Sequence, residues 1–65
     1  MRNPRKDPQP GDALIYGPKW QRERVDVTEV GPGYVRGVMN CGSVLYSTRQ
    51  WLEWMVGAEV IHAAG

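Results

Sequence analysis

Short segments of alternating apolar and polar residues run along this chain and are separated by glycine and proline. The clearest alternation spans residues 23–30, where Val25 and Val27 are apolar and their neighbours are polar. A period of two is typical of a half-buried β-strand. Strict alternation would next put Glu29 on the apolar face, but the next valine is Val30. We therefore expect a β-bulge or a strong twist at this point.

Turn signals divide the rest of the chain into further short strands. The predicted strands are residues 13–16, 23–30, 34–39, 43–46 and 58–61. Residues 31–33 (Gly-Pro-Gly) and 40–42 (Asn-Cys-Gly) are predicted to be short turns, so the three middle strands form an antiparallel meander. A longer loop, residues 17–22, separates the first strand from the second.

The hydrophobic period changes after the fourth strand, and a helix is predicted over about residues 48–56. Ser47 and Gln50 have the spacing of a capping box, in which each side chain bonds to the backbone N–H of the other residue. This signal predicts that the helix begins directly after Ser47.

One apolar face of the predicted helix carries Trp51, Trp54 and Met55 at positions i, i+3 and i+4. We expect this face to pack inward. The two tryptophans are offset by about 60° around the helix axis. If only one of them is buried, we expect Trp54 to be the exposed one and to mark an interface. Gly57 is expected to end the helix in the left-handed conformation.

Five short strands with a helix before the last predict a mainly β fold, a small five-stranded SH3-like barrel. Pairing of the first and last strands would partly close the sheet. We expect residues 1–10, with three prolines, to be a flexible N-terminal arm, residues 11–62 to be one complete barrel domain, and residues 63–65 to be a frayed tail. The predicted core is Leu14, Val25, Val27, Val30, Val35, Val38, Val44, Trp51, Leu52, Met55 and Val60.

The chemistry-bearing residues of this 65-residue chain do not form a recognisable catalytic set. One cysteine, Cys41, and one histidine, His62, exclude an intramolecular disulfide and a four-ligand zinc site. Cys41 lies in a predicted turn and His62 lies directly before the predicted tail, so a nucleophile–base pair is not expected. The glycine-rich turn at residues 31–33 leads into a strand, unlike a phosphate-binding loop. We expect no catalytic activity, no cofactor and no small-molecule substrate.

The net charge is +1, but its distribution is uneven. Residues 1–24 carry six basic and three acidic side chains, and residues 25–65 carry two basic and four acidic ones. An ordinary solvated surface is the preferred interpretation, because the chain lacks the strongly basic character of nucleic-acid binders. No apolar run approaches the roughly 18 residues of a membrane span, and no signal-peptide pattern follows the basic N-terminus. We expect a soluble, cytoplasmic protein with no membrane partner.

Trp20 is a candidate recognition residue because it lies in a predicted loop beside Lys19 and near Arg22. Tryptophan, tyrosine and arginine are enriched at interface hot spots. The alternative is that Trp20 folds back and caps the open end of the barrel. Three tyrosines near strand ends would either line a groove with Trp20 or be partly buried with their hydroxyls in water: Tyr16, Tyr34 and Tyr46.

The basic residues of neighbouring predicted strands are Arg22, Arg24 and Arg36. If Arg24 and Arg36 share the outer face with Tyr34, they would form a small basic patch. Such a patch would bind single-stranded nucleic acid through stacking and phosphate contacts. An ordinary solvated face is the alternative.

Several structural segments carry a resemblance to known proteins. They are Pro10-Gly11-Asp12, Val27-Thr28-Glu29-Val30, the helix with Trp51 and Trp54, and Ala58-Glu59-Val60. With these segments the chain resembles, over roughly residues 7–61, a family of small uncharacterised proteins of tailed bacteriophages and prophages. The resemblance implies a phage or prophage origin and the cytoplasm of a bacterial host. It transfers no functional residue.

Together these patterns favour a non-catalytic binding module for protein–protein interaction, either with a host factor or with a second copy of itself. The alternative is a small nucleic-acid-binding module that uses a basic face. The candidate binding residues are Tyr16, Trp20, Arg22, Arg24, Tyr34, Arg36 and Trp54.

Overall fold

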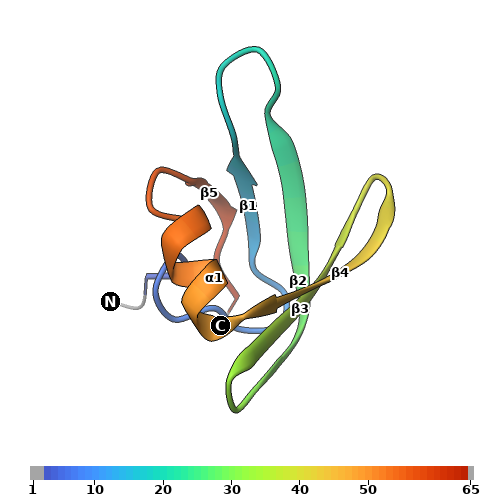
Figure 1. The fold of residues 1–65 in the computed structure, drawn as a ribbon, viewed down its shortest axis with the longest axis vertical. Helices are drawn as coiled ribbons and strands as arrows, with labels where there is room; N and C mark the ends of the chain where they lie inside the picture. The colour runs from blue at the N-terminus through green and yellow to red at the C-terminus, as the bar shows by residue number, and fades with distance from the viewer. Residues whose placement is uncertain (1–2, 65) are drawn as a thin grey trace.

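The computed structural model describes residues 3–64 and shows a mainly β fold with one short helix (Figure 1). The elements in chain order are β1 (Ala13–Tyr16), β2 (Glu23–Gly31), β3 (Tyr34–Met39), β4 (Gly42–Ser47), α1 (Thr48–Trp54) and β5 (Glu59–His62). The five strands form one antiparallel sheet in the order β4-β3-β2-β1-β5. The predicted meander and the helix before the last strand are confirmed.

The long strand β2 contains the predicted irregularity. Val27 and Glu29 pair with neighbouring residues of β3, so Thr28 is an extra residue on β2. In a regular strand, residues three positions apart lie on opposite faces. Because the bulge adds one residue, both Val27 and Val30 contact the core. The predicted bulge is therefore confirmed.

The sheet is open but strongly curled. β5 pairs with β1, with Leu14 opposite Val60, as predicted. Within residues 3–64 no pairing joins β5 to β4, so these two strands are the edges of the sheet. The hydroxyls of Tyr16 on β1 and Tyr46 on β4 lie 3.1 Å apart, although two strands separate β1 from β4. Only a curled sheet brings these two side chains together.

Helix α1 begins as predicted and ends two residues earlier. The Ser47 hydroxyl accepts from the backbone N–H of Gln50 at 3.1 Å, and the Gln50 side chain accepts from the Ser47 N–H at 3.1 Å. The prediction for Gly57 is wrong, because this residue does not adopt a positive φ. The chain instead leaves the helix through a tight turn in which the Ala58 N–H bonds to the Met55 carbonyl at 3.2 Å. Such a turn needs no left-handed residue.

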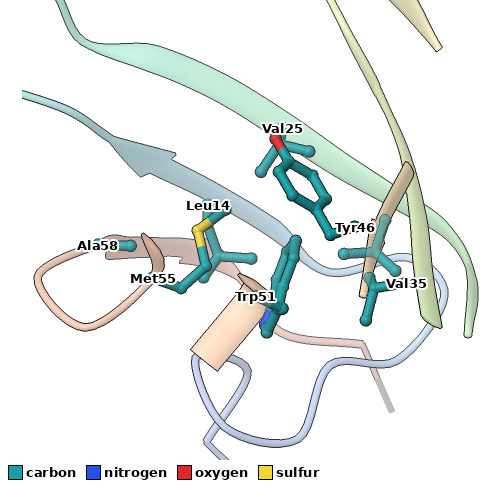
Figure 2. Packing of buried hydrophobic residues seen from close by; sticks show 8 residues of the cluster. Leu14, Val25, Val35, Tyr46, Trp51, Met55 and Ala58 are labelled. Carbon is teal, nitrogen blue, oxygen red and sulfur yellow. The ribbon is translucent and has the colours of Figure 1, made fainter. Parts of the chain in front are cut away.

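Trp51 is fully buried and lies at the centre of the core. Figure 2 shows its ring between Leu14 and Met55 on one side and Tyr46 and Val35 on the other. The buried apolar residues are Ala13, Leu14, Val25, Val27, Val35, Tyr46, Trp51, Met55 and Ala58. The predicted core residues that are only partly buried against this cluster are Val30, Val44 and Val60.

Two predicted core residues, Val38 and Leu52, are exposed. On β3 the buried positions are Val35 and Gly37, so Val38 points to the outer face. A Cβ at Gly37 would lie 2.9 Å from a side-chain methyl group of β2, which explains why the inward position carries glycine. Leu52 follows the buried helix position by one residue, which rotates it by about 100° away from the core.

The N-terminal segment packs against the domain. Pro4 and Pro8 are buried. The Trp51 indole N–H donates to the Pro4 carbonyl at 3.0 Å, and the Arg5 guanidinium donates to the Ala58 carbonyl at 2.7 Å. The prolines exclude this segment from helix and strand, which is why a separate arm is predicted for residues 1–10, but they do not exclude packing.

Asp12 connects three parts of the chain at the start of β1 and is fully buried. Its carboxylate accepts from the backbone N–H of Gln9 at 2.8 Å and of Ala64 at 2.6 Å. Its own carbonyl accepts from the Val27 N–H at 2.8 Å. The described part of the predicted tail is thus bonded to the domain, while Gly65 lies outside the described residues.

Candidate functional site

An open groove lies where the ends of β1 and α1 approach the start of β2 and the β3–β4 turn. Its volume is about 360 Å³. The side chains that give it its chemical character are Tyr16, Tyr46, Trp54, Met39, Glu23 and Gln50. We call this the aromatic groove. Three ring-bearing side chains from three different elements therefore meet here, which is the kind of surface that the chain can offer to a partner.

The rings of the aromatic groove contact one another at the distances of paired aromatic side chains. The ring centroids of Tyr46 and Trp54 lie 5.8 Å apart, and those of Tyr16 and Trp54 lie 6.5 Å apart. Tyr46 also packs edge-on against buried Trp51, with centroids 5.6 Å apart. The groove is therefore continuous with the core, which holds its floor in place.

The two tyrosine hydroxyls of the groove contact each other and the same sulfur atom. Tyr16 and Tyr46 hydrogen-bond to each other at 3.1 Å, and each hydroxyl also lies 3.5 Å from the Met39 sulfur. The helix geometry that buries Trp51 leaves Trp54 54% exposed beside the rings of Tyr16 and Tyr46. The prediction that Trp54 is the exposed tryptophan of the helix is confirmed.

Burial raises the pKa of the Tyr46 phenol well above its ordinary value of about 10, and the hydrogen bond with Tyr16 raises it further. The nearby charge of Glu23 acts in the same direction. Tyr46 therefore stays protonated at alkaline pH values at which a free phenol ionises, with its hydroxyl engaged by Tyr16 and Met39.

Alkaline pH is expected to destabilise the fold through Tyr46. An unfolded tyrosine ionises near pH 10. Because the folded pKa is higher, the contribution to stability is fully present below about pH 10 and is lost as the pH rises above that value. Urea unfolding midpoints measured between about pH 8 and about pH 11 should fall less in Tyr46→Phe than in the wild type. Tyr34→Phe is the matched control, and an identical alkaline loss in Tyr46→Phe and wild type would contradict the assignment.

Glu23 supplies a negative charge at the edge of the groove. Within residues 3–64 its carboxylate makes no ion pair or hydrogen bond. Cys41 also borders the groove and is an exposed free thiol. Glu23 and Met39 are site residues that were not predicted from the sequence. The alternation of β2 and β3 could have placed both residues on the inner face of the sheet. Glu23 shares the face of Val25, and Met39 shares the face of Val35.

Trp20 does not cap the fold, so that alternative is wrong. Its side chain is 85% exposed in the loop between β1 and β2, which projects from the body of the protein (cyan in Figure 1). It is not among the residues that line the aromatic groove of its own chain. The predicted groove that Trp20 would line together with the tyrosines is therefore not formed within a single chain.

The predicted basic patch is not formed by free arginines. Arg22 pairs with Glu59 at 3.1 Å. Arg24 pairs with Asp26 at 3.1 Å and Arg36 pairs with Glu29 at 3.2 Å. Arg24 and Arg36 do share the outer face, but the strand register separates them by four residues, or about 14 Å. The three arginines are therefore paired with carboxylates, and Arg24 and Arg36 are too far apart to form one basic patch.

Tyr34 is not among the residues that line the aromatic groove. It follows the β2–β3 turn, in which Gly33 adopts a φ of 80°. Its ring covers Gly31, where a Cβ would lie 2.2 Å from a ring carbon. The structure thus brings Tyr16, Tyr46 and Trp54 together and leaves Tyr34 apart.

A second cavity, of about 390 Å³, lies between the exposed side of α1 and the N-terminal segment. Leu52, Val56, Asn3, Arg5 and Lys6 line it. It contains no aromatic side chain, so the aromatic groove is the better candidate site.

Neither a metal site nor a membrane-spanning helix is found in the described part of the chain. No group of three histidine, cysteine, aspartate or glutamate side chains in residues 3–64 is arranged to hold a metal ion. The helix found there is too short to cross a membrane. Comparison of the chain with protein-family models, with curated proteins and with solved structures finds no match.

Proposed function

We propose that this protein is a non-catalytic interaction module that binds a protein segment in the aromatic groove. The observation that carries the proposal is the half-exposed indole of Trp54, held against Tyr16 and Tyr46 by ring contacts. Exposed tryptophan and tyrosine side chains in a preformed groove are the residues most enriched at interface hot spots. Their hydroxyl and indole N–H groups can also bond to a peptide backbone.

Two further arguments support a peptide partner. The five-stranded layout with a helix before the last strand fits the SH3-like barrels, many of which bind extended peptides on aromatic surfaces. The resemblance to proteins of tailed phages and prophages would place the partner in the cytoplasm of a bacterial host.

Catalysis and nucleic-acid binding have less support. Cys41 lies in the β3–β4 turn, whereas His62 ends β5 at the far edge of the sheet. The strand arginines lie beside carboxylates, which reduces the positive field available to a phosphate backbone. We therefore propose protein binding rather than the nucleic-acid alternative.

Selection of peptides from a random display library with the immobilised domain tests the proposal. The affinity of a selected peptide is then measured by titration calorimetry for wild type and Trp54→Ala. We expect Trp54→Ala to raise Kd at least tenfold, which corresponds to about 1.4 kcal/mol.

Leu52→Ala is the matched control, because Leu52 lies on the same helix, is exposed and is outside the groove. It should leave Kd unchanged. Circular dichroism of both variants verifies that they are folded. Failure to select any peptide, or equal affinity for wild type and Trp54→Ala, would rule out the aromatic groove as the binding site.

A further inference from the structure

The loop between β1 and β2 presents Trp20 on a preformed turn. The Gln21 N–H bonds to the Pro18 carbonyl at 3.0 Å, which puts Lys19 and Trp20 at the tip of the turn. Gly17 begins the loop with a φ of 110°, and a Cβ there would lie 2.5 Å from the Gln21 carbonyl oxygen. A loop whose backbone is already held in this way loses little backbone entropy when a partner buries its tip.

The tip of this loop and the aromatic groove are chemically complementary. The tip offers an indole and a cation, Trp20 and Lys19. The groove offers aromatic rings and the carboxylate of Glu23, which has no ion-pair partner within residues 3–64. An indole can pack on the exposed ring of Trp54 while the ammonium group approaches the carboxylate.

The position of the loop excludes its own groove as the receptor and favours the groove of another copy. Trp20 is almost fully exposed and does not line the groove of its own chain. The loop nevertheless directly connects two groove residues, Tyr16 and Glu23. Because the loop and the groove adjoin, one two-fold axis can bring the loop of each copy to the groove of the other.

We propose that two copies of this protein form a two-fold symmetric dimer in which the Trp20 side chain of each copy occupies the aromatic groove of the other. Lys19 of each copy then pairs with the partner's Glu23. This inference rests on the proposed function, because it names the occupant of the same groove.

The dimer is expected to be weak. Each buried tryptophan removes roughly 150–250 Å² from water, and the opposing groove surfaces add a similar area. The total stays below the roughly 1,200 Å² of a standard interface. We therefore expect a dissociation constant of micromolar order or weaker.

Sedimentation velocity from about 10 µM to about 1 mM tests the dimer. We expect the wild type to approach the mass of two chains, and no larger species, at the upper concentrations. Trp20→Ala should raise the dissociation constant at least tenfold, whereas Leu52→Ala should leave it unchanged. Because Trp20 is exposed, its replacement leaves the fold intact, which circular dichroism verifies.

Exchanging the two charges tests whether Lys19 and Glu23 contact each other across the dimer. Nonspecific association of exposed surfaces would not give the expected pattern. Lys19→Glu and Glu23→Lys should each dimerise at least about threefold more weakly than the wild type. A mixture of the two variants should recover dimerisation, because opposite charges then meet at both contacts.

The outcomes separate this inference from the proposed function. A wild type that stays monomeric at all concentrations, a dimer that survives Trp20→Ala, or continued growth beyond two chains would overturn the inference. Peptides that bind in a Trp54-dependent manner to a monomeric protein would leave the proposed function standing and assign the groove to a different partner.

Discussion

Trp51→Ala is expected to lower the free energy of unfolding more than any surface substitution at 25 °C. Trp51 is fully buried between α1 and the sheet, and its indole N–H is bonded to the Pro4 carbonyl. Truncation of a buried tryptophan to alanine costs about 3–5 kcal/mol. The whole stability of a 65-residue domain is only about 3–10 kcal/mol. A single substitution thus removes a large part or all of it.

Urea unfolding followed by far-ultraviolet circular dichroism measures this effect. Trp20→Ala is the matched control, since it is the same substitution at an exposed position, and its unfolding free energy should stay within about 0.5 kcal/mol of the wild type. Trp51→Phe should have an intermediate effect, because it keeps most of the buried ring and loses the bond to Pro4. Similar unfolding midpoints for Trp51→Ala and Trp20→Ala would show that the core is not organised around Trp51.

Asp12→Ala is expected to destabilise the fold by about 3 kcal/mol. The buried carboxylate accepts from two backbone N–H groups, those of Gln9 and Ala64. Hydrogen bonds to a charged group contribute about 1.5–3 kcal/mol each, and a buried N–H left without an acceptor adds a desolvation penalty. The same substitution would release the segment that precedes β1 and the segment that follows β5.

Asp12→Asn distinguishes the role of the carboxylate from that of side-chain size. Asparagine has nearly the same shape but only one acceptor oxygen, so one of the two N–H groups would face an amide NH₂. We expect this variant to be destabilised as well, with faster hydrogen exchange at Gln9 or Ala64. Wild-type stability and unchanged exchange in Asp12→Asn would contradict the importance of the two bonds.

The aromatic groove was only partly predictable from local pattern. Tyr16, Tyr46 and Trp54 each stand out in the sequence, and helix geometry correctly favours Trp54 as the exposed tryptophan. Their meeting depends on the curl of the sheet, which brings the hydroxyls of Tyr16 on β1 and Tyr46 on β4 to within 3.1 Å of each other. Alternation within one strand describes which face a residue occupies and contains no measure of that curl.

The arginines illustrate the same limit. The condition that Arg24 and Arg36 lie on one face of the sheet is met, since both alternate with buried neighbours on their strands. The carboxylates beside them come partly from the same strand and partly from across the sheet, as Asp26 and Glu29 show. A charge count cannot reveal that pairing, because it depends on strand register.

The sequence by itself determined the local elements of this protein: the alternating strands, the bulge at Thr28 and the helix that begins after Ser47. These features depend on backbone geometry over a few residues, so local residue patterns specify them. The tertiary structure alone decided that Asp12 is buried, that Pro4 accepts from Trp51 and that Trp20 is left exposed. Each of these outcomes depends on groups far apart in the chain competing for the same small interior, and no local pattern encodes the result.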